Sequence, residues 1–151
     1  MTKNTMFNID IPIHPSLVHF PIALLVTGAF AAILFRILRK PQAELWGVYS
    51  LLVGWALTLP ALITGLIDKN AITPGSPADA VANLHTTLMI AMWITFGMAL
   101  YLYFMWRKKD QLTGGKVWIW FGLLLLAVIL IILAGHQGAR LVYELGVGSA
   151  P

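Results

Sequence analysis

Four long apolar runs dominate this chain, and each is long enough to cross a lipid bilayer as a helix. The runs extend over about residues 16–38, 45–67, 81–106 and 117–135. A helical span needs about 20 apolar residues, because a helix rises about 1.5 Å per residue and the hydrocarbon core is about 30 Å thick. The sequence therefore predicts an all-α integral membrane protein, an up-down-up-down four-helix bundle that forms a single domain over residues 1–151.

The composition supports a membrane protein and excludes several kinds of site. Charged residues make up 11% of the chain, whereas a soluble domain carries about 25%. The chain contains no cysteine. This excludes disulfides, thiolate metal sites, iron–sulfur clusters and covalent attachment of haem.

The basic residues cluster at one level and predict the orientation in the membrane. The ends of the first and third spans, with the loops that follow them, hold seven of the ten Lys and Arg residues: Arg36, Arg39, Lys40, Arg107, Lys108, Lys109 and Lys116. Cytoplasmic loops are enriched in such residues. We therefore expect a multi-pass protein of the bacterial inner membrane with both termini periplasmic. Because these charges mark topology, the net charge of +4 predicts no nucleic-acid partner.

All four histidines are predicted to lie at the opposite, periplasmic level. His14 and His19 open the first span, His85 opens the third, and His136 ends the fourth. Ionisable residues within membrane segments are rare and mark functional sites by default. The histidine level is therefore where the sequence predicts a site.

A haem of the b type is the first interpretation of this site. It needs two imidazoles from different helices and no cysteine. We expect His19 and His85 to be the axial ligands. His14, from the loop before the first helix, would support a ligand, contact quinone or replace one of the ligands. Arg140 is placed to reach a haem propionate, and His136 is a further candidate. Such a protein would pass electrons between quinone and a periplasmic redox protein.

Two alternatives stay open. In the first, His14, His19 and His85 bind a zinc, copper or iron ion, with Asp68 as a fourth ligand or as a partner of a ligand. In the second, the histidines are structural and the chain is a cofactor-free membrane anchor for a redox partner. No catalytic constellation is recognisable, so whether the protein is an enzyme is left open, and a homo-oligomer is compatible with the sequence.

The sequence is less informative about the C-terminal end of the chain and about an internal repeat. The glycines at positions 135 and 138 are expected to end the fourth helix, and residues 139–145 are expected to form a short amphipathic helix on the surface. Each half of the chain holds two spans, but the halves show no convincing internal repeat.

Several stretches of the chain resemble one bacterial family of membrane proteins. The stretch IHPSLVHFPIALL over residues 13–25, GLID over 65–68, His85, and GARLVYELGVG over 138–148 are similar to the signatures of domain of unknown function 2231. The resemblance implies a four-span membrane domain, sometimes joined to Rieske or cytochrome-type domains. By that association it favours electron transfer, with His14, His19 and His85 as the matched histidines.

Overall fold

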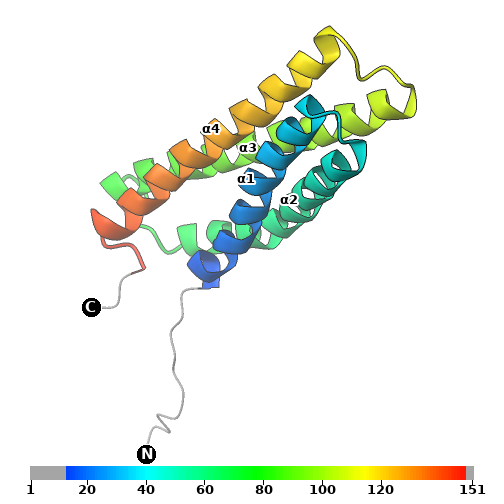
Figure 1. Ribbon diagram of the computed structural model, residues 1–151. Helices are drawn as coiled ribbons and strands as arrows, with labels where there is room; N and C mark the ends of the chain where they lie inside the picture. Colours follow the sequence, from blue (N-terminus) through cyan, green and yellow to red (C-terminus); the bar gives the residue numbers. More distant parts are fainter. Residues whose placement is uncertain (1–12, 149–151) are drawn as a thin grey trace, which may run out of the picture.

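Four helices make up the computed structural model, which describes residues 13–148 (Figure 1). They are α1 (Ile13–Ile37), α2 (Pro41–Lys69), α3 (Pro77–Lys108) and α4 (Gly115–Tyr143). No strand occurs in this part of the chain. The predicted all-α, four-helix bundle is confirmed, and each helix extends beyond at least one end of its predicted span.

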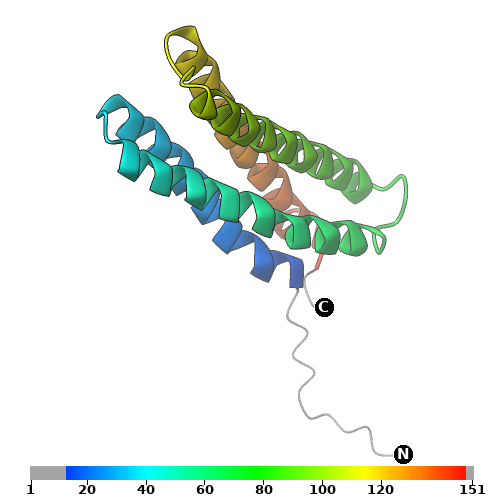
Figure 2. The same cartoon turned by 90° about the vertical axis from the view of Figure 1, so that its right-hand side faces the viewer.

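The helices pack as two antiparallel hairpins, α1 with α2 and α3 with α4, and the hairpins lie against each other (Figure 2). Contacts within each hairpin outnumber those between them. The start of α1, the α2–α3 loop and the end of α4 lie at one end of the bundle (Figure 1). We call it the histidine end, after His14 and His85. The α1–α2 turn and the α3–α4 loop lie at the other end, which we call the basic end after Arg36 and Arg107.

Glycines bring the backbones of α1 and α2 into contact. A Cβ atom at Gly28 would lie 2.9 Å from the Gly47 carbonyl oxygen, and one at Gly47 would lie 2.6 Å from the backbone nitrogen of Ala32. Small residues allow such close approach between membrane helices, where packing rather than the hydrophobic effect drives association. This explains why the first hairpin is a tight unit.

The seam between the hairpins contains a pair of stacked tryptophans. Trp55 of α2 and Trp93 of α3 have ring centroids 4.6 Å apart and planes inclined by 15°. The indole N–H of Trp55 donates a hydrogen bond of 2.9 Å to the Trp93 carbonyl oxygen. This contact fixes α2 against α3 through ring stacking and one hydrogen bond.

The outer surface of the bundle is apolar on every helix. Large side chains such as Phe30, Ile63, Ile94 and Ile132 are each more than half exposed. Each helix contains a stretch apolar and long enough to span a bilayer. A soluble protein rarely exposes so large a continuous apolar surface. The chain is therefore a multi-pass membrane protein whose exposed apolar side chains face lipid.

The N-terminus of α3 is capped by side chains. The Ser76 hydroxyl accepts a 3.1 Å hydrogen bond from the Asp79 backbone N–H, and the Asp79 carboxylate accepts a 3.0 Å bond from the Gly75 N–H. A side-chain cap satisfies a backbone donor that has no partner within the helix.

Replacing Ser76 by alanine is therefore expected to lower the free energy of unfolding by about 1 kcal/mol. Thermal unfolding followed by circular dichroism in detergent would measure the loss. The exposed Thr73 in the same loop is the matched control, and Thr73→Ala is expected to change stability by less than about 0.5 kcal/mol. Equal losses in both variants would contradict the role of the cap.

The end of α4 differs from the sequence prediction. The helix passes through Gly135 and Gly138 and continues to Tyr143. The separate surface helix expected over residues 139–145 is therefore not formed. Glycine weakens a helix only modestly, and the backbone of α4 lies against a side chain of α3 at Gly138, as described below.

Candidate functional site

His14 lies in the first turn of α1 and is bonded to α2. Its Nδ1 atom is 2.8 Å from the Ala61 carbonyl oxygen and 3.4 Å from the Thr64 hydroxyl oxygen. A carbonyl oxygen can only accept a hydrogen bond, so Nδ1 carries the proton and donates it. In the neutral ring, this leaves Nε2 as the unprotonated nitrogen, with a lone pair available to a metal ion.

His85 of α3 is bonded to α4 in the same way. Its Nδ1 atom is 2.8 Å from the Ala134 carbonyl oxygen, so it also donates a proton to a backbone acceptor. Metal-ligating histidines almost always donate their second ring N–H to a carboxylate, carbonyl or water. Both rings therefore have the tautomer and the support that a metal-ligating imidazole requires.

A glycine lies directly against each histidine ring. It follows, by one helical turn, the alanine whose carbonyl oxygen accepts the hydrogen bond from that ring. A Cβ atom at Gly65 would lie 2.8 Å from His14 Cε1, and a Cβ atom at Gly138 would lie 3.2 Å from His85 Cε1. The two acceptor helices thus share an Ala-x-x-x-Gly motif, at residues 61–65 and 134–138. The halves of the chain repeat one arrangement, although their sequences show no convincing repeat.

The two histidine rings meet across the seam between the hairpins. Their centroids are 6.4 Å apart and their planes are inclined by 88°. A metal ion binds an imidazole nitrogen at about 2.0–2.1 Å. Because that nitrogen lies on the ring edge, two rings on opposite sides of one ion have centroids roughly 6 to 6.5 Å apart. The observed separation of 6.4 Å falls in this range.

The ligand pair expected from the sequence, His19 with His85, is not the one that the structure brings together. His19 has an exposed side chain on α1. It follows His14 by five residues, which rotates its direction by about 140° around the helix. When His14 faces the seam, His19 therefore points away from it.

The other predicted residues lie apart from the ring pair. His136 and Asp68 have exposed side chains. Arg140 is engaged along α4, with bonds of 3.0 Å to Glu144 and 3.1 Å to Gln137. Within residues 13–148, no group of three or more His, Asp or Glu side chains is arranged to hold a metal ion. The described residues therefore do not assemble the site with three histidines and Asp68.

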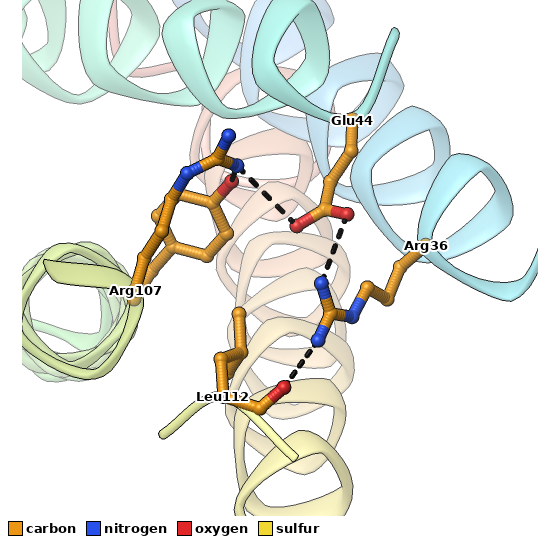
Figure 3. Close-up of polar contacts among 5 residues, drawn as sticks. Arg36, Glu44, Arg107 and Leu112 are labelled. Carbon is orange, nitrogen blue, oxygen red and sulfur yellow. Dashed lines mark hydrogen bonds and ion pairs between the residues drawn. The ribbon is translucent and has the colours of Figure 1, made fainter. Parts of the chain in front are cut away.

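The basic end holds a second polar cluster that the sequence analysis missed. Glu44 of α2 is 1% exposed. Its carboxylate oxygens lie 3.4 Å from the Arg36 guanidinium and 4.0 Å from the Arg107 guanidinium, so Glu44 reaches between α1 and α3 (Figure 3). Arg36 also donates to the Leu112 carbonyl oxygen, and Arg107 donates to the Tyr103 hydroxyl. We call these five residues the Glu44 clasp.

A sequence signal for the clasp exists but is weak. Glu44 is an acidic residue at the edge of an apolar run, eight positions after Arg36, and this placement suggests a local ion pair. Arg107 lies 63 positions further along, so only the tertiary fold shows that it shares the same carboxylate.

The fold and the ring pair define a class: a polytopic membrane protein of four helices, with one histidine from each hairpin facing the seam. The chain belongs to a known family, described as predicted membrane protein (DUF2231), whose model matches residues 10–151. Neither the curated proteins nor the solved structures contain a match.

Proposed function

We propose that this protein binds a b-type haem between its two hairpins, with His14 and His85 as axial ligands. The observation that carries the proposal is the ring pair itself, with centroids 6.4 Å apart and each Nδ1 proton donated to a carbonyl oxygen. Gly65 and Gly138 support the proposal, because a Cβ atom at either position would crowd the adjacent histidine ring.

The number of protein ligands favours haem over a bare metal ion. A structural zinc ion takes four protein ligands and a catalytic one takes three. The described residues supply two imidazoles and no third His, Asp or Glu beside them. A haem brings four nitrogens of its own, so two axial histidines complete its coordination.

The chain's own residues hold and orient the rings. Ala61 and Ala134 fix the proton on Nδ1, while Gly65 and Gly138 set how closely each ring lies to the neighbouring helix. When bound, the haem supplies one-electron redox chemistry. We propose that the site lies near the periplasmic face of the bacterial inner membrane and exchanges electrons with quinone and a periplasmic redox protein.

The test is a reduced-minus-oxidised optical spectrum of the full chain, purified in detergent after expression with ample haem. We expect a sharp reduced α-band that disappears in His14→Ala and in His85→Ala. His19→Ala and His136→Ala are matched controls, since both side chains are exposed, and they are expected to keep the band. Size-exclusion chromatography and circular dichroism would check that each variant is folded.

Three results would contradict this assignment. A colourless wild-type protein would overturn the haem proposal, and equimolar zinc, copper or iron in that sample would indicate a bare metal site. A colourless protein without metal would leave the anchor for a redox partner as the function. Loss of the band in His19→Ala but not in His14→Ala would show that the ligand pair is misassigned.

A further inference from the structure

A cavity of about 380 Å³ opens beside the Glu44 clasp, at the turn between α1 and α2. Its lining comes from Arg36, Arg39, Pro41 and Glu44. Two of these side chains are positive and one is negative, so the lining carries a net positive charge. Glu44 is ion-paired with Arg36 at 3.4 Å and with Arg107 at 4.0 Å, so its single negative charge is already shared by two guanidinium groups and does not offset a third.

Arg39 is the uncommitted cation of this cavity. Its side chain is exposed and, within residues 13–148, makes no ion pair or side-chain hydrogen bond. Arg36, by contrast, is held in place by Glu44 and by the Leu112 carbonyl oxygen. The cavity therefore combines one fixed guanidinium with one that is free to close on a ligand.

The start of α2 adds further positive potential. Lys40 precedes the helix and provides no side-chain cap, and Pro41 has no N–H. The first hydrogen bond at this end is donated by the Glu44 N–H to the Lys40 carbonyl oxygen. The N–H groups of the first turn before Glu44 therefore lack partners within the helix, as at any helix start, and favour an anion.

The surroundings of the cavity are apolar and exposed. Ile37, Leu38 and Trp46, which lie within two positions of lining residues in the sequence, are 63%, 50% and 76% exposed. Tryptophan side chains are enriched where a membrane meets water. A ligand that satisfies both features has an anionic head beside the arginines and a hydrocarbon part along these three side chains.

We propose that this cavity binds the phosphate group of an anionic phospholipid from the leaflet at the basic end. Arg36 and Arg39 bind the phosphate oxygens, because a guanidinium presents its N–H donors in a fork that matches phosphate. Glu44 acts as a positioning residue that orients Arg36. Basic pockets between membrane helices recognise anionic head groups in this manner. The site is independent of the histidine pair.

Native mass spectrometry of the full chain, delipidated in detergent and titrated with phosphatidylglycerol, tests the proposal. We expect one tightly bound lipid and at least tenfold weaker binding in Arg39→Gln, which leaves the clasp intact. Lys109→Gln is the matched control, because it removes one exposed charge at the same end without touching the cavity, and it is expected to change binding less than twofold. Arg36→Gln is expected to weaken binding as well, and its unfolding curve would show whether the clasp has opened.

Three results of this titration would overturn the proposal. Equal weakening in Arg39→Gln and Lys109→Gln would show a diffuse attraction to surface charge. Equal affinity for phosphatidylcholine, whose head group has no net charge, would show that the anion is not recognised. Full displacement of the lipid by millimolar inorganic phosphate would assign the cavity to a free phosphate instead.

Discussion

Exchanging Gly65 for alanine is expected to displace the His14 ring and to weaken the proposed haem binding by about 10- to 100-fold, the usual effect of disturbing the residues that orient a ligand. The new Cβ would lie 2.8 Å from His14 Cε1, a distance that real Cβ contacts essentially never show. His14 is bonded to the same helix through Ala61, so it cannot move aside without losing that bond. Haem titration followed by absorbance would measure the change.

Substitutions at two other glycines test how the loss of haem binding depends on the distance from the new Cβ to a histidine ring. Gly138→Ala is expected to act more weakly on His85, because its Cβ would lie 3.2 Å from the ring. Gly135→Ala, three residues away in the same helix, is the matched control, since a Cβ there meets nothing within 4 Å. It should leave haem binding unchanged and raise stability by about 0.5–1 kcal/mol. Unchanged haem affinity in Gly65→Ala would show that this glycine does not determine the position of His14.

Replacing Glu44 by alanine is expected to lower the free energy of unfolding by about 3 kcal/mol, because it leaves two arginines facing each other at the basic end without their carboxylate. The Glu44 side chain is 2% exposed, while those of Arg36 and Arg107 are 29% and 37% exposed. Partial hydration of the two arginines places the loss at the lower end of the range for a broken buried pair. Unfolding in mixed micelles with rising SDS would measure it.

Glu144→Ala is the matched control for this variant. It also removes a glutamate that is paired with an arginine, Arg140, at 3.0 Å, but its side chain is 58% exposed. Exposed pairs one helical turn apart contribute about 0.3–0.5 kcal/mol. Similar losses in the two variants would show that the Glu44 clasp does not join the hairpins.

The sequence predicts the helices well because the property that creates them is local. An apolar run bounded by basic residues and turn formers identifies a span without knowledge of its neighbours. The exception is the end of α4, where glycines at 135 and 138 were interpreted as a stop signal. At Gly138 the glycine instead allows the backbone to lie against His85.

Which histidines lie together is harder to predict from the sequence, because it depends on the direction of side chains. With the first helix expected to begin near Ser16, His14 fell in the preceding loop and His19 became the nearest helical histidine. The helix begins at Ile13 instead. This earlier start brings His14 into the helix, on the face that meets α2, and His19, five residues later, then points in a different direction. The clasp escaped prediction because Arg107 reaches Glu44 only through tertiary folding.

The division of the ring pair between two hairpins has a thermodynamic consequence. Neither hairpin alone offers more than one of the two imidazoles, so a ligand that needs both binds only when the hairpins are docked. By mass action, binding to the docked state alone shifts the equilibrium toward it. For the proposed haem, binding and docking of the hairpins would then be one equilibrium, and without haem the two hairpins are expected to part more readily.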